Sequence, residues 1–180
     1  FSEKERGNEL YAAAGDRGQA NILFSIVSNM VLQNKELSSR AKVFRNSITN
    51  ESKGNFFQAI SSDSKTKHGY SAGCVIMDEL HVQPNRDLYD TLLTSTGARL
   101  EPLFISITTA GYNKNSIGWE VYNYAKQVQN KLIEDPSFYS AIYEADLDDD
   151  ITDEEVWKKS NPNYGISLRK EYMRRESQRA

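Results

Sequence analysis

The stretch "GCVIMDELHVQPNRDLYD", Gly73 to Asp90, contains the sharpest change of character in the chain. A run of small and apolar residues ends in two acids and a histidine, and the chain then breaks at Pro84 and continues with a helix-like pattern. A continuous apolar run indicates a strand with both sheet faces covered, as in parallel sheets. The predicted strand, residues 72–79, therefore carries Asp78 and Glu79 at its carboxyl end.

The segments around this strand alternate between two patterns. Further strands are expected at residues 9–15, 41–49, 54–61, 100–111 and 137–146, and helices at 17–34, 85–98, 116–135 and 167–180. The polar residues 50–53 indicate a hairpin between the second and third of these strands. Because strands alternate with helices, the predicted fold class is α/β, with a mostly parallel sheet flanked by helices.

Several local signals set helix boundaries and buried faces. Asp16 is a favourable N-cap for the helix at 17–34, Asn85 and Gly97 are expected to begin and end the helix at 85–98, and Thr152 with Glu155 forms a capping box. In the helix at 17–34, apolar residues at helical spacing predict one buried stripe. Its members are Ala20, Leu23, Ile26, Val27, Met30 and Val31. The strand at 100–111 is also expected to be buried.

Length and composition limit the class of protein. With 180 residues, 38% of them hydrophobic and 26% charged, the chain fits one soluble domain, or one domain with an appendage. Its apolar runs are too short to span a membrane, so no membrane association is expected. The opening "FSEKERGNEL" lacks a leader-like pattern, and we expect an internal piece of a longer protein. The single cysteine, Cys74, excludes an internal disulfide.

Charge is unevenly distributed along the chain. The net charge of −3 does not indicate a nucleic-acid-binding protein by itself. Acids concentrate between Glu134 and Glu155, whereas bases dominate after Val156. We interpret the acidic run as a solvated loop and helix start, and the basic tail as a solvated surface, with contact to nucleic acid as the alternative.

Polar side chains follow the ends of two predicted strands. Asp78 and Glu79 end one of them, and Thr108 and Thr109 end another. In open α/β sheets, ligands bind in the crevice beyond the carboxyl ends of the strands. These four side chains are therefore expected to face one crevice.

An apolar strand that delivers Asp and then Glu is the pattern of a Walker B element, in which the Asp holds Mg²⁺ and the Glu polarises the water that attacks the γ-phosphate of ATP. "DELH" also has the form of a helicase box. The plainer alternative is a strand that runs into a charged turn. A P-loop is missing, because none of the ten glycines is followed by Lys. Either the chain is not an ATPase, or the P-loop lies upstream of Phe1.

Four blocks of sequence resemble the ATPase half of the large terminase subunit of tailed double-stranded DNA bacteriophages. They are "LYAAAGDRGQANILF", "HGYSAGCVIMDELHVQPNRDLYDTLLTSTGARLEP", "LFISITTAG" and "YEADLDDDITDEEVWKKSNPNYGISL", in that order. The resemblance implies a P-loop NTPase core of the additional-strand catalytic-glutamate type, without its N-terminal Walker A part. It implies residues 1–147 as the partial ATPase core, and 148–180 as a helical lid or linker toward a metal-dependent nuclease domain that is not in these residues.

The resemblance also implies a function and partners. The family packages double-stranded DNA into a procapsid with ATP and Mg²⁺, in the cytoplasm of the bacterial host. Its partners are the DNA, the small terminase subunit and the portal protein, and the large subunit forms a homo-oligomeric ring.

Roles carried over by position follow the matched motifs. Asp78 is the expected metal-associated acid and Glu79 the catalytic base, while Thr108, Thr109 and Gly111 would sense the γ-phosphate and couple hydrolysis to DNA movement. Residues with a possible nucleotide or DNA contact are Arg17, Gln19, His81 and Arg99. Arg99 and the basic loop with Lys65, Lys67 and His68 are candidates for the trans-acting arginine or its equivalent, with plain surface charge as the alternative.

Two other functions stay open from the sequence. One is a helicase-type ATPase fragment, although "ITTAG" replaces the Ser-Ala-Thr-type strand end that is usual there. The other is a non-catalytic module that binds DNA or a partner subunit. In either case these 180 residues alone are expected to be inactive, because nothing in them supplies the phosphate cradle.

Overall fold

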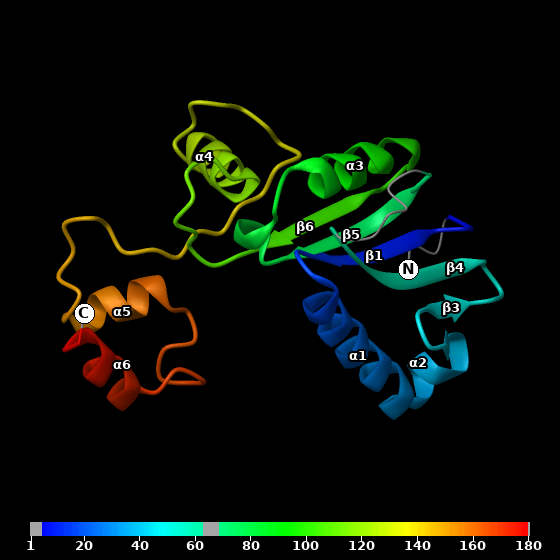
Figure 1. Cartoon of the computed structure of the whole chain (residues 1–180), viewed down its shortest axis with the longest axis horizontal. Helices are drawn as coiled ribbons and strands as arrows, with labels where there is room; N and C mark the ends of the chain where they lie inside the picture. Colours follow the sequence, from blue (N-terminus) through cyan, green and yellow to red (C-terminus); the bar gives the residue numbers. More distant parts are fainter. Residues whose placement is uncertain (1–4, 63–68, 180) are drawn as a thin grey trace. The chain divides into compact units, whose positions relative to one another are not determined.

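The computed structural model describes residues 5–62 and 69–179 (Figure 1). It contains two compact units, Phe1–Lys126 and Gln127–Ala180, and each is described by itself. The boundary between these units falls earlier than the domain boundary expected after residue 147, which stays a prediction.

The first unit is built on a six-stranded mixed sheet. Its strands are β1 (Glu9–Ala14), β2 (Lys42–Val43), β3 (Ile48–Asn50), β4 (Asn55–Ser61), β5 (Ala72–Asp78) and β6 (Leu103–Ile107). They lie in the order β2-β3-β4-β1-β5-β6. The pairs β1–β4, β1–β5 and β5–β6 are parallel, and β2–β3 and β3–β4 are antiparallel. The α/β fold class and the hairpin are therefore confirmed, whereas the expected strand at 41–49 is split into two short ones.

Helices connect the strands of this unit. They are α1 (Arg17–Gln33), α2 (Lys35–Arg40), α3 (Asp87–Ser95) and α4 (Ile117–Gln129, which ends just inside the second unit), with short 3₁₀ turns η1 (Leu80–Val82) and η2 (Thr96–Ala98). Asp16 caps α1, since its Oδ1 accepts a hydrogen bond of 3.0 Å from the Gln19 N–H. The Asn85 Oδ1 atom likewise accepts from the Asp87 N–H, at 3.0 Å. Asp16 is therefore confirmed as an N-cap, whereas Arg86 occupies the N-cap position of α3 and the cap predicted at Asn85 lies one residue too early.

Two separate cores lie on the two faces of the sheet, one under α3 and one under α1 (Figure 1). The α3 side includes Tyr11, Ala13, Val75, Met77, Leu80, Leu88 and Leu92. The α1 side includes Ala12, Phe24, Val31, Ile48 and Phe57. Alternate residues of β1 thus face opposite cores, as side chains do along any strand.

The buried stripe predicted for α1 is wrong in part. Ala20, Phe24, Ser28 and Val31 are the buried residues of the helix. Ile26 and Met30 are 52% and 60% exposed, and Ile22, on the same side, is 61% exposed. We call these three residues the α1 stripe. The apolar residues of α1 extend around two sides of the helix. In the described part of the chain, only the side that faces β1 and β4 is covered.

The expectation that β6 is buried is also wrong. β6 is the edge of the sheet, and Leu103, Ile105 and Ile107 are 52%, 37% and 55% exposed. Their partners on β5 that share this face are Cys74, Ile76 and Asp78. We call the apolar members, Cys74, Ile76, Leu103, Ile105 and Ile107, the open face. An edge strand with this composition is unusual, because edges normally carry charges, bulges or Pro.

β5 leaves the sheet through a strained residue. Glu79 has φ 51° and ψ 55°, the left-handed region that residues with a side chain rarely adopt. This turn directs the chain from β5 into η1 within one residue. Strain of this kind clusters at functional sites.

The second unit contains α5 (Glu154–Ser160) and α6 (Lys170–Ser177). Two predictions fail here: residues 137–146 form no strand, and Asp153 rather than Thr152 caps α5, accepting from the Glu155 N–H at 2.8 Å. Buried Trp157 anchors α5, because its Nε1–H donates to the Ile151 carbonyl at 2.6 Å.

Ion pairs dominate the surface of the second unit. Lys159 bonds Asp149 at 2.8 Å and also contacts Asp146, and the hydrogen bond from Lys159 lowers the pKa of the Asp149 carboxyl. Glu154 pairs with Lys170 at 2.9 Å and with Arg174 at 3.7 Å. Acids and bases of this unit therefore neutralise one another in part.

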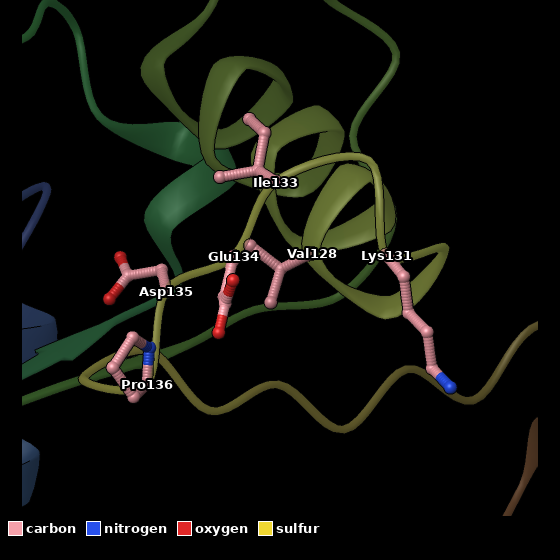
Figure 2. A pocket seen from close by; sticks show the side chains of 6 residues that line it. All are labelled: Val128, Lys131, Ile133, Glu134, Asp135 and Pro136. Atoms are coloured by element: carbon pink, nitrogen blue, oxygen red, sulfur yellow. The ribbon is translucent and has the colours of Figure 1, made fainter.

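A shallow pocket also lies in this unit (Figure 2). It is lined by Val128, Lys131, Ile133, Glu134, Asp135 and Pro136. Within residues 5–62 and 69–179, no helix combines the length and apolarity that crossing a bilayer requires.

The burial difference between two methionines gives a test of the fold. Met77→Ala should lower the free energy of unfolding by about 2–5 kcal/mol, since Met77 is fully buried. Met30→Ala should change it by no more than about 0.5 kcal/mol, since Met30 is on the exposed α1 stripe. Urea unfolding followed by circular dichroism measures both. Equal losses would contradict the described packing of α1.

The backbone at Glu79 gives a second test. Asn tolerates the left-handed region, whereas β-branched Val does not. Glu79→Val should therefore be less stable than Glu79→Asn by about 1–3 kcal/mol in the same unfolding assay. Both variants remove the carboxylate, so the difference reports the backbone alone. Identical stabilities would show that Glu79 is not held in this conformation.

Candidate functional site

The carboxyl ends of three parallel strands, β1, β5 and β6, meet at one edge of the sheet (Figure 1). The turn from β1 into α1 packs directly on η1, because a Cβ atom at Gly15 would lie 3.2 Å from the Val82 carbonyl oxygen. The segments that follow β1 and β5 therefore touch. From the sequence, the ligand-binding crevice is expected at this edge, which stays a prediction.

Asp78 is the last residue of β5 and pairs in register with Ile107, the last residue of β6. It is partly exposed and, by alternation along the strand, lies on the same face as the open face. A single accessible carboxylate at a strand end suits Mg²⁺, which is held by one or two carboxylates and completes its shell with waters and phosphate oxygens. In the described part of the chain, no three His, Cys, Asp or Glu side chains gather as a metal-binding group.

Glu79, His81 and Thr108 form a polar cluster beside Asp78. His81 Nδ1 lies 2.9 Å from Thr108 Oγ1 and 3.1 Å from Glu79 Oε2. The His81 backbone N–H donates to the same threonine oxygen at 3.1 Å, and the threonine hydroxyl donates to the Thr109 carbonyl at 3.0 Å. Of the residues predicted for the site, the structure thus brings Glu79, His81 and Thr108 together.

Buried polar atoms without hydrogen bonds occur at this edge. Glu79 Oε2 is one, because His81 Nδ1 is near it but is not aligned for a hydrogen bond. The others are Gln19 Oε1, at the start of α1, and Gln83 Nε2, after η1. Most buried polar groups in proteins are paired, so each of these atoms has unused capacity to bind a ligand or water. Sequence reasoning missed Gln83, which looks like an ordinary loop residue.

Two glycines allow close packing around His81. A Cβ atom at Gly111 would lie 2.8 Å from His81 Cβ, and one at Gly118 would lie 3.0 Å from His81 Cα. Gly111 was predicted as part of the coupling segment, whereas Gly118, at the start of α4, was missed. The segment after β6 and the start of α4 therefore hold His81 from two sides.

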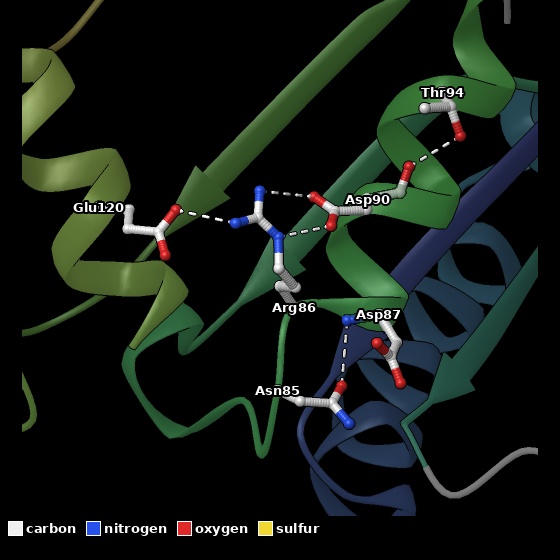
Figure 3. Close-up of polar contacts among 6 residues, drawn as sticks. All are labelled: Asn85, Arg86, Asp87, Asp90, Thr94 and Glu120. Atoms are coloured by element: carbon white, nitrogen blue, oxygen red, sulfur yellow. Dashed lines mark hydrogen bonds and ion pairs between the residues drawn. The ribbon is translucent and has the colours of Figure 1, made fainter. Parts of the chain in front are cut away.

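Arg86, also missed, joins α3 to α4 (Figure 3). Its guanidinium bonds the Asp90 carboxylate at 2.6 and 3.3 Å and the Glu120 carboxylate at 3.1 Å. The bond to Asp90 raises the pKa of Arg86 above its ordinary value. Arg86 therefore connects α3 to the start of α4, where Gly118 lies. Its charge is already paired with two carboxylates, so it is not available to bind a phosphate.

The remaining cationic candidates lie in different places. Arg17 is exposed at the start of α1, at the crevice edge, and stays a candidate. Arg99 does not fit the expected nucleotide contact. Its guanidinium donates to the carbonyls of Ser71 and Gly7, at 2.7 to 2.9 Å, near the amino ends of β5 and β1 and so at the opposite edge of the sheet. Lys65, Lys67 and His68 lie outside the described residues.

Similarity to known proteins agrees with this geometry. Residues 2–127 match the family model described as "Terminase large subunit, ATPase domain". The chain is 30% identical over 187 residues to the "Terminase, large subunit" of Enterobacteria phage HK97, covering 99% of this chain and 35% of that protein. It is 38% identical over 112 residues to "Protein YmfN" of Escherichia coli strain K12, covering 62% of this chain and 25% of that protein.

A solved structure shares the fold. The crystal structure of the HK97 bacteriophage large terminase superposes with a TM-score of 0.84 at 26% sequence identity, over 98% of this chain and 37% of that one. The chain thus spans about a third of the HK97 protein. Because the family model matches more than half of the 180 residues, this chain belongs to the family of the terminase large subunit ATPase domain.

Proposed function

We propose that this chain is the part of a phage DNA-packaging motor that carries the Walker B acids and the coupling segment of its ATPase. The observation that carries the proposal is the contact between the ends of β5 and β6, where Glu79 and Thr108 share His81. A charged turn that served only to end a strand would not require a glutamate in the left-handed region or a contact with the end of the next strand.

Each acid has a separate role in ATP hydrolysis. Asp78 would hold Mg²⁺, which supplies charge stabilisation to the phosphates when bound. Glu79 would orient the attacking water and accept its proton, and its buried, unpaired Oε2 atom leaves acceptor capacity for this. Thr108 would report the state of the γ-phosphate, since its hydroxyl can exchange hydrogen-bond partners with little movement. Thr109 and Gly111 belong to the same segment.

The phosphate cradle would come from outside these 180 residues, and the exposed surfaces indicate where it binds. The free edge of β6 can pair with one more parallel strand, and the open face with the α1 stripe can pack against one more helix. Parallel sheets normally have both faces covered. A strand–helix unit satisfies both requirements at once.

Handedness selects the face that such a unit covers. The connection from β1 to β4 runs toward the β2 edge of the sheet, and its helix α1 lies on one face. The connection from β5 to β6 runs in the opposite direction, and its helix α3 lies on the other face. A strand beside β6 that led through a helix into β1 would run in the same direction as the β1–β4 crossover. Because parallel crossovers are right-handed, its helix would lie on the α1 side, over the open face. The junction between that strand and helix would then lie at the crevice edge, beside Asp78.

Substrates and partners follow from family membership. We propose ATP and Mg²⁺ as cofactors and double-stranded DNA as the translocated substrate, moved into a procapsid in the cytoplasm of the bacterial host. The small terminase subunit, the portal protein and further copies in a ring would be the partners, and a nuclease domain would follow α6. The basic side chains of α6 include Arg174 and Arg175, which would contact DNA phosphates.

ATP hydrolysis tests the proposal. The 180-residue chain should be inactive with Mg²⁺ and duplex DNA. A form extended upstream of Phe1, by its own gene's residues or by those that precede the matched segment in the HK97 protein, should hydrolyse ATP. Glu79→Gln in the extended form should lower kcat by at least about 100-fold, since it removes the general base. A phosphate-release assay measures all forms.

Asp148→Asn is the matched control, since it removes an exposed carboxylate of the second unit and should leave kcat unchanged. If the extended form hydrolysed ATP equally well with Glu79→Gln, the role of Glu79 would be wrong. If no extended form were active, even with DNA and partner proteins, a non-catalytic binding module would be the better interpretation.

A further inference from the structure

His81 is placed between the two residues whose roles the proposed function separates, the base Glu79 and the coupling residue Thr108. The distances from its Nδ1 atom are 3.1 Å to Glu79 Oε2 and 2.9 Å to Thr108 Oγ1. The imidazole is mostly buried, with 23% of its side chain exposed. This arrangement gives His81 contact with both of these residues.

The hydrogen-bond inventory determines which ring nitrogen carries the proton. The Thr108 hydroxyl lies 3.0 Å from the Thr109 carbonyl oxygen, and a hydroxyl that donates its single hydrogen there is an acceptor toward His81. Glu79 Oε2 is a carboxylate oxygen and can only accept. An unprotonated Nδ1 atom would direct its lone pair at the lone pairs of Thr108 Oγ1 and Glu79 Oε2, which is repulsive. With the Thr108 hydroxyl hydrogen directed at the Thr109 carbonyl, these contacts are best satisfied by a hydrogen on Nδ1.

Packing prevents His81 from moving away from these acceptors. The close approach of Gly111 to His81 Cβ and of Gly118 to His81 Cα leaves no room for a shift of the backbone. The His81 N–H is itself bonded to Thr108 Oγ1 at 3.1 Å. Displacement of Thr108 would therefore remove one oxygen from both the backbone N–H and the Nδ1 atom of His81.

We propose that His81 is a positioning residue whose Nδ1–H group is held by Thr108 Oγ1 and can turn to the nearby, unpaired Glu79 Oε2, which links the base to the coupling segment. With Thr108 in place, Nδ1–H is held by the threonine and the Glu79 carboxylate is free to accept the proton of water. When Thr108 withdraws, Nδ1–H turns to Glu79 and occupies the acceptor that hydrolysis needs. The inference rests on the proposed function for its consequence, but the hydrogen-bonding arrangement can be tested without it.

The first test is ¹⁵N NMR of histidine-labelled chain. The chain has two histidines, and the signal lost in His81→Asn identifies His81. We expect the neutral ring to carry its hydrogen on Nδ1, the less common tautomer. Removing both acceptors, in Glu79→Ala with Thr108→Val, should shift it toward Nε2–H. A ring that is Nε2-protonated in the unmodified chain, or that does not respond to loss of the acceptors, would overturn the proposal.

The second test uses ATP hydrolysis by the extended form. His81→Ala should lower kcat by about 10–100-fold and leave KM for ATP unchanged, since a misplaced group costs rate rather than affinity. His81→Asn, whose side-chain amide places an N–H near the position of Nδ1–H, should restore most of the rate. Equal losses in both variants, or none in either, would contradict a positioning role.

The two proposals fail in different ways. If Glu79→Gln abolishes hydrolysis and His81→Ala does not affect it, the proposed function holds and the role of His81 is wrong. If no form hydrolyses ATP, the proposed function fails, and the NMR result still decides whether Nδ1–H is shared between Glu79 and Thr108.

Discussion

The register between β5 and β6 is the constraint on which the site depends. Pairing of Asp78 with Ile107 ends both strands at the same level, so the residues that follow, Glu79 to His81 and Thr108, have to meet. The left-handed turn at Glu79 then brings His81 back toward Thr108 within two residues. A register shift of one residue would place these side chains on the wrong faces, because strand side chains alternate.

Much of this could be predicted from sequence because the signals were local. The apolar run before Asp78 identified β5, and Asp16 and Asn85 identified the starts of helices through hydrogen bonds to the next few residues. The crevice followed from the direction of parallel strands. The contact between His81 and Thr108 joins residues 27 apart, and no local pattern encodes it. The same holds for Arg86 and Glu120, whose bridge depends on how α3 and α4 pack.

The failed predictions share a physical cause. Ile26, Met30 and β6 have the composition of buried elements, and sequence patterns report composition rather than the presence of a covering partner. The strand predicted at residues 137–146 is absent for a similar reason, since apolar and aromatic residues favour strands only where a neighbouring strand accepts their hydrogen bonds. The exposed apolar surface next to the candidate site is the observation on which the proposed additional strand and helix rest.

Binding of Mg²⁺–ATP tests the central claim most directly, because it asks whether the crevice edge needs a phosphate cradle from outside the 180 residues. Isothermal titration calorimetry on the chain and on its extended form separates binding from turnover. The account predicts no measurable binding by the chain alone, and binding by the extended form that is weakened when Asp78 is changed to Asn in the presence of Mg²⁺. Equal binding by the two forms, or none by either, would contradict it.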